Sequence, residues 1–330
     1  MKVSKNIKIF FNYFLGPALF IWLAWSIYHQ VSKQPDLAAS WQYIKGSLNG
    51  SRIWLLIGTV LLMLISWGIE TAKWRMAILK LQYISFGNAY KAVLAGASVA
   101  IATPARIGEY VGRVFYIEEG NRIKAASITV ATSFSQLIVT ILMGTVGLWL
   151  LRPFIIQQDI LSPAWANAIL WASFGTLIIL LLIYFRISWL AKWLDKLPFF
   201  KKISWIIQDL EGFDAIFLAK ILSLSILRYF VFILQYFLLF QLFGVKTDIW
   251  QTFMSTSVVM LVISVIPAIA LFTDLGIRNE VSLKMVGLFS ANHLGISFAA
   301  IGIWFINIII PAIIGSLLIL GMKRIFKKNI

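Results

Sequence analysis

Long runs of apolar residues, separated by short charged segments, extend along the chain. Six of these runs are long enough to cross a hydrocarbon core of about 30 Å, which takes roughly 20 helical residues. They are residues 9–28, 53–70, 125–150, 164–185, 218–243 and 294–321. The pattern therefore predicts an all-α, polytopic integral membrane protein.

Two further apolar runs, residues 86–103 and 249–266, differ from the six spans. Each is followed by a proline, Pro104 or Pro267, and then by a charged stretch that contains glycine. A broken helix is tolerated at membrane depth only where it is buried in protein or lines a water-filled cavity. We therefore expect two re-entrant helical hairpins in addition to the six spans.

The composition agrees with a membrane protein, because 60% of the residues are hydrophobic and 13% are charged, against roughly a quarter charged in soluble domains. The formal net charge of +16 would suggest nucleic acid on a soluble chain. Here the basic residues lie between the apolar runs, so we interpret them as cytoplasmic loops that face anionic headgroups. We expect the membrane surface, and no nucleic acid, as their partner.

The distribution of Lys and Arg predicts the topology. If both proline-ended runs turn back, 21 basic residues lie on one side of the membrane and seven on the other. This bias predicts that both termini lie in the cytoplasm. We expect the protein in the plasma (inner) membrane. No small-residue cleavage site follows the first run, so we expect a retained span and no cleaved signal peptide.

The order of spans and hairpins predicts an inverted repeat. Residues 1–155 and 156–321 each contain two spans, a hairpin and a further span, and the two hairpins enter from opposite sides. Residues 322–330 form a basic cytoplasmic tail, and residues 1–330 form a single transport domain. Such repeats recur in secondary transporters. The aromatic and basic segment 187–208 predicts helices on the membrane surface, and residues 37–48 predict a weaker equivalent.

The sequence argues against an enzyme. It has no cysteine and two histidines, His29 and His293, each next to a span, so a metal centre is not expected. No phosphate-binding loop and no serine nucleophile motif occurs. We expect neither catalysis nor a cofactor.

Charged residues follow the proline of each hairpin. After Pro104 come Arg106, Glu109 and Arg113; after Pro267 come Asp274, Arg278 and Glu280. Arginine offers a planar fork of donors to phosphate, and ionisable groups at membrane depth are functional by default. We expect all six to bind substrate. The alternatives are an internal Arg106–Glu109 ion pair and an Asp274–Arg278 pair on a surface helix.

Arg228 lies about ten residues into the fifth span, seven residues from Gln235 and on the same helical face. We expect Arg228 either to contact a substrate headgroup along its path or to pair with Glu280, because an arginine at this depth faces protein or water. Glu70, at the predicted end of the second span, is expected to be interfacial, and no role is assigned to it.

The element Pro104, Arg106, Gly108 and Glu109, with the later Gly276, Arg278 and Glu280, resembles the transmembrane region of lysylphosphatidylglycerol synthases and its stand-alone flippase-like relatives. Trp74-Arg75 is similar to a tryptophan-arginine position of that family, which adds Arg75 to the substrate-binding candidates. The segment Phe272-Thr273-Asp274 departs from the small, glycine-rich approach that is common in the family. Nine residues follow the last span, so we expect the soluble synthase domain to be absent.

The resemblance implies that the protein moves an anionic or modified phospholipid, or a polyprenyl-phosphate-linked lipid, between leaflets. Two alternatives stay open. One is a small-solute or ion-coupled secondary transporter on the same scaffold, and the other is a non-transporting membrane scaffold for a partner glycosyltransferase or synthase.

Overall fold

The computed structural model describes residues 25, 37–50, 52–101, 103, 106–186, 212–266 and 271–327. Most of the first predicted span, the predicted surface segment 187–208 and both hairpin prolines, Pro104 and Pro267, lie outside the described residues.

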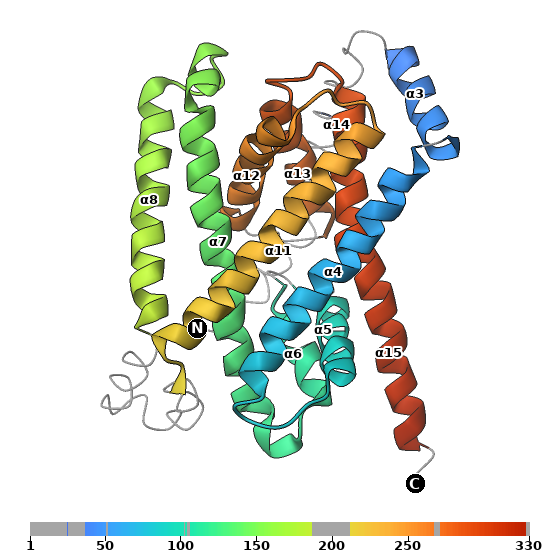
Figure 1. Ribbon diagram of the computed structural model, residues 1–330, viewed down its shortest axis with the longest axis vertical. Coiled ribbons are helices and arrows are strands. Elements are labelled where there is room, and N and C mark those ends of the chain that lie inside the picture. The colour runs from blue at the N-terminus through green and yellow to red at the C-terminus, as the bar shows by residue number, and fades with distance from the viewer. Residues whose placement is uncertain are drawn as a thin grey trace, which may run out of the picture. The chain divides into compact units, whose positions relative to one another are not determined.

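The described spans are helical, as predicted (Figure 1). They are α4 (Ile53–Ile78), α7 (Arg122–Gln157), α8 (Pro163–Phe185), α11 (Ala215–Leu242) and a last helix made of α14 (His293–Trp304), the π-helical turn η6 (Phe305–Ile309) and α15 (Ile310–Lys327). Within the described part of the chain, five helices are long and apolar enough to cross a membrane. The all-α, polytopic architecture is confirmed.

Helix α4 extends two turns beyond the predicted end of its span at residue 70. The added turns contain Lys73, Trp74 and Arg75. The hydropathy pattern ended the span too early because it weighs a charged residue as if it were solvated. In the structure Glu70 and Lys73 are buried and paired, so the helix continues through them.

The two proline-ended runs form short helices that are each followed by a second helix. They are α5 (Phe86–Ile101) followed by α6 (Gly108–Arg113), and α12 (Ile249–Val265) followed by α13 (Leu271–Val286). Helix α5 packs against α6, and α12 packs against α13. A Cβ on Gly96 would lie 2.8 Å from Arg113, and a Cβ on Gly112 would lie 2.6 Å from Gly96. The lack of space for a side chain at Gly96 and at Gly112 shows that α5 and α6 approach closely, as a helical hairpin requires.

The chain divides into two compact units, each assembled from three segments. Unit 1 comprises Met1–Met63, Met143–Leu170 and Phe232–Asn307, and unit 2 comprises Leu64–Leu142, Trp171–Val231 and Ile308–Ile330. Unit 1 contains the α12–α13 pair and unit 2 the α5–α6 pair. Each unit thus draws on both predicted repeat halves, and the inverted repeat itself stays a prediction.

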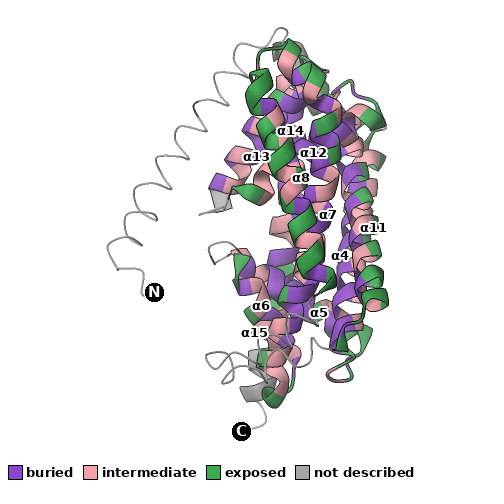
Figure 2. Ribbon diagram, turned by 90° about the vertical axis from the view of Figure 1, so that its left-hand side faces the viewer, coloured by how far each residue is buried: buried purple, intermediate pink, exposed green. Residues whose placement is uncertain are grey.

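Within unit 2, α5 is held between α6 and α15. Gly315 of α15 lies against Leu94 and Ser98 of α5, where a Cβ would lie 3.0 Å from the Ser98 Cβ. Within unit 1, α13 packs against α12 and α14, and α14 contacts α3 (Leu37–Asn49), the helix expected over residues 37–48. Figure 2 shows buried positions gathered on α5 and α12, the first helices of the two pairs.

Candidate functional site

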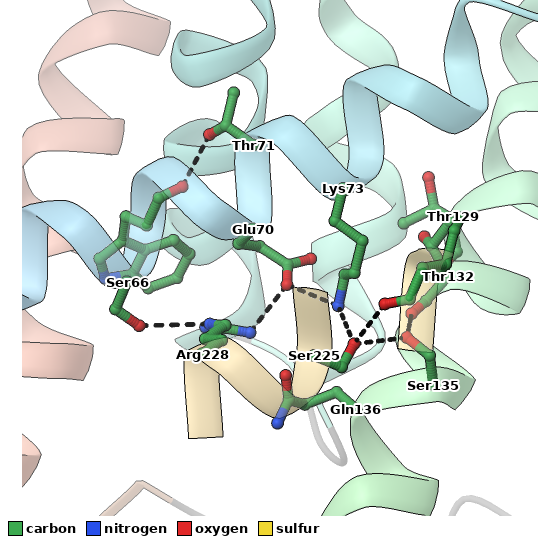
Figure 3. Close-up of polar contacts among 12 residues, drawn as sticks. Ser66, Glu70, Thr71, Lys73, Thr129, Thr132, Ser135, Gln136, Ser225 and Arg228 are labelled. Atoms are coloured by element: carbon green, nitrogen blue, oxygen red, sulfur yellow. Dashed lines mark hydrogen bonds and ion pairs between the residues drawn. The ribbon is translucent and has the colours of Figure 1, made fainter. Parts of the chain in front are cut away.

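A buried group of charged side chains lies in unit 2, where α4, α6 and α11 contribute to it. We call it the Glu70 cluster. Its members are Glu70 and Lys73 of α4, Glu109 and Arg113 of α6, and Arg228 of α11. Figure 3 shows Glu70 between Lys73 and Arg228, with hydroxyl side chains around them.

Glu70 is the centre of the cluster and accepts from three cations. Its Oε2 lies 2.8 Å from Lys73 Nζ and 2.8 Å from Arg228 Nη1. Its Oε1 lies 2.9 Å from Arg113 Nη2, which also donates to Glu109 Oε1. The Glu70 side chain is 3% exposed. The expectation of an interfacial Glu70 is therefore wrong, because neighbouring helices supply the counter-charges that allow its burial.

Hydroxyl groups surround the charged side chains (Figure 3). Lys73 Nζ donates to Ser225 Oγ over 3.4 Å, and Ser225 Oγ lies 2.8 Å from Ser135 Oγ of α7. Arg228 Nε donates to Ser66 Oγ over 3.3 Å. Beside the cluster, Trp74 Nε1 donates to Thr129 Oγ1 over 2.8 Å. Polar residues of α7 recur at 129, 132, 135 and 136, a helical spacing that gives α7 a polar face.

The cluster has an unbalanced charge, since it contains three cations and two carboxylates. The Arg113 side chain is fully buried, and its Nε and Nη1 donors have no hydrogen-bond partner among the described residues. Such donors are costly to bury unless an acceptor satisfies them. Arg228 and Glu109 have the most exposed side chains of the cluster, at 22% and 24%. The arrangement can therefore receive an anion, with Arg228 as its accessible cation.

Arg106 and Glu109 do not form the ion pair that was considered as an alternative. Helix α6 begins at Gly108, so Arg106 precedes it, in the left-handed region with φ 57°. The two residues therefore share no helical face, and Glu109 pairs with Arg113 instead. Arg106 is exposed, and its side chain makes no hydrogen bond or ion pair with the residues that the structure describes.

Arg228 and Gln235 face the same helix, as their spacing predicted. Gln235 Nε2 donates to the backbone carbonyl of Thr59 in α4 over 3.0 Å, and Arg228 contacts Ser66 and Glu70 of α4. Arg228 forms an ion pair with Glu70, a partner that the sequence did not suggest. The hydropathy pattern placed Glu70 at the membrane interface and therefore offered no reason to expect it as a partner of Arg228.

Arg75 has a structural contact at the end of α4. Its Nε donates to the backbone carbonyl of Ile84 over 2.9 Å, across the connection that leads to α5. The neighbouring Trp74 is fully buried. Substrate binding by Arg75 stays a prediction.

In unit 1, Arg278 of α13 lies between an acid and a phenol. Its Nη2 lies 3.4 Å from Asp274 Oδ2, and its Nη1 donates to the Tyr236 hydroxyl over 3.2 Å. The Asp274 and Arg278 side chains are 13% and 7% exposed, so the pair is largely shielded from solvent and not on an exposed helical face. Glu280 is also buried and forms a 3.5 Å pair with Lys284.

Lys73 and Glu70 are the site residues that sequence reasoning missed. Their spacing of three places both on one helical face, and apolar residues continue after them to Ile78. That continuation was the available signal. No group of three or more His, Cys, Asp or Glu side chains that could hold a metal ion occurs among the described residues.

Comparison with known proteins identifies a matching family. The family model described as "Lysylphosphatidylglycerol synthase TM region" matches residues 13–315, which include every member of the Glu70 cluster and of the Arg278 pair. Comparisons with curated proteins and with solved structures find no match. Because the family model covers nearly the whole chain, the protein belongs to the family of the lysylphosphatidylglycerol synthase transmembrane region.

Proposed function

We propose that the protein is a flippase-like transporter that moves an anionic phospholipid or a polyprenyl-phosphate-linked lipid between membrane leaflets. The observation that carries this proposal is the cation excess of the Glu70 cluster, which lies among apolar helices and has arginine donors without a hydrogen-bond partner in the described part of the chain. Charged groups in membrane-spanning regions are costly and usually mark a substrate path. A cluster that only stabilised the fold would not require three cations for two carboxylates.

The chemistry of the cluster suits a phosphate group. Arginine presents parallel N–H donors that match phosphate oxygens, and preplaced donors replace the water that a headgroup loses when it enters the membrane. Arg278, with Asp274 and Tyr236, gives unit 1 an arginine of the same type. We assign the lipid headgroup to the arginines of the Glu70 cluster and leave the acyl or prenyl chains in the bilayer.

This function is a transport role, without catalysis by the described helices. The family's printed description concerns the transmembrane region of a synthase, so a partner membrane enzyme that makes or uses the lipid is part of the proposal. We further propose a plasma-membrane location. The distribution of basic residues supports an orientation with both termini in the cytoplasm.

Liposomes that contain purified protein test the proposal. Labelled phosphatidylglycerol or a labelled polyprenyl-phosphate-linked lipid should change leaflets faster than in protein-free vesicles, and Arg228→Gln should abolish the acceleration. Arg122→Gln is the matched control, because Arg122 forms an exposed pair with Glu119 outside the cluster, and it should transport normally. Uptake of a soluble substrate without lipid movement would identify a solute transporter, and no acceleration in any variant would identify a scaffold.

A further inference from the structure

The Glu70 cluster also indicates how an anion enters and leaves, an inference that rests on the proposed function. We infer that the Glu70 carboxylate competes with the anion for Arg228, and that a singly charged phosphodiester replaces Glu70 as the partner of Arg228.

The first step of the argument is the charge count. Glu70 and Glu109 leave one positive charge of the cluster unbalanced. One bound monoanion makes the net charge of the cluster zero. Three separate ion pairs can then form, which are the anion with Arg228, Glu70 with Lys73, and Glu109 with Arg113. A dianion would make the net charge of the cluster negative, and its second charge would lack a counter-ion in a region where unpaired charges are costly.

The second step is the choice of Arg228 as the exchangeable cation. Lys73 and Arg113 are 1% and 0% exposed, whereas the Arg228 side chain is 22% exposed. Arg228 uses Nη1 for Glu70 and Nε for Ser66. Its Nη2 makes no hydrogen bond with the described residues, so an incoming phosphate oxygen can bind there first.

The third step is the competition itself. Lys73 and Arg228 both donate to Glu70 Oε2, each over 2.8 Å. When an anion binds Arg228, Glu70 keeps Lys73 at Oε2 and Arg113 at Oε1, so the carboxylate is not left unpaired. When the anion leaves, Glu70 accepts from Arg228 again. The carboxylate thereby weakens binding, and turnover requires an anion that is released as well as bound.

Removal of Glu70 alone would leave three cations with one carboxylate, so the test uses a variant with the same net charge. Glu70→Gln combined with Lys73→Met keeps an excess of one positive charge but frees Arg228 from competition. The matched control is Glu119→Gln, because Glu119 is 88% exposed. The probes are dimethyl phosphate, a soluble monoanionic phosphodiester; dioctanoyl phosphatidylglycerol, a lipid with the same group; and sulfate, a dianion. Calorimetry on the full chain in detergent measures each affinity.

The double variant should bind both phosphodiesters about tenfold more tightly than the wild-type protein, the change expected when a competing charge-assisted contact is lost. Lys73→Met alone should bind at least tenfold more weakly, because its cluster is already neutral. Glu119→Gln should not change affinity. Addition of Arg228→Gln to the double variant should remove the gain.

Two results would overturn the inference. One is an unchanged affinity in the double variant, and the other is sulfate binding as tightly as dimethyl phosphate. These failures differ from a failure of the proposed function. Lipid transport with an unchanged double variant contradicts only the competition. Tighter binding by the double variant, without lipid transport, supports the competition and contradicts the lipid carrier.

Discussion

The central position of Glu70 predicts an asymmetry between removing its charge and removing that of a neighbour. Glu70→Gln deletes three attractions, at 2.8, 2.8 and 2.9 Å. Each is worth about 6 kcal/mol in gross Coulomb energy at an effective dielectric constant near 20, before desolvation is subtracted. The substitution also raises the excess charge of the cluster from one to two. Breaking a buried pair from one side costs about 3–5 kcal/mol, and we expect a loss of this size.

Lys73→Met deletes one of these attractions and one of three mutually repelling cations. We therefore expect it to cost less than Glu70→Gln. The double variant removes both partners of one buried pair, a change that is often neutral, so it should recover at least half of the loss caused by Glu70→Gln. The coupling free energy from this double-mutant cycle measures the pair directly.

The assay is reversible unfolding in mixed detergent and dodecyl sulfate, followed by circular dichroism. Glu119→Gln is the control and should change stability by less than about 0.5 kcal/mol, because its charge is at the surface. The reasoning is refuted if Glu70→Gln is as stable as this control, or if Lys73→Met costs more than Glu70→Gln.

Three further predictions concern other parts of the chain. Arg106→Ala should abolish lipid transport in vesicles and shift stability by less than about 0.5 kcal/mol, because the exposed side chain has no described partner; a folding defect would assign Arg106 to the structure. Gly315→Ala should cost about 1–3 kcal/mol in the same unfolding assay, because its Cβ overlaps α5. Gly321→Ala on the same helix meets nothing within 4 Å and is its control; equal stability would contradict the packing of α5 on α15. Cysteines at Gly120 and Asp159, in a chain without native cysteine, should be labelled from the cytoplasmic and external sides respectively, and external labelling at Gly120 would overturn the topology.

Much of the fold could be predicted because a membrane-spanning helix has a local signal in the sequence. A run of about 20 apolar residues is enough to place a span, and Pro104 and Pro267 were enough to divide two shorter runs. The predicted start at residue 53 coincides with that of α4. Only its end was wrong, where charged residues continue the helix.

The site was harder to predict because its partners are distant in sequence. Arg113 and Arg228 were both expected to be functional, but their shared partner was not. Glu70 is 43 residues from Arg113 and 158 residues from Arg228, so the counter-charges that permit its burial are invisible to a local pattern. The Arg106–Glu109 alternative failed for a local reason, since it assumed that the helix begins at the proline and α6 begins at Gly108.

A structure determined in nanodiscs that contain phosphatidylglycerol tests the central claim most directly. The account predicts phosphate density in contact with the Arg228 guanidinium. It also predicts that the 2.8 Å contact between Arg228 and Glu70 is lost while Glu70 keeps Lys73 and Arg113. An intact Arg228–Glu70 pair, with no headgroup density at the cluster, would contradict it.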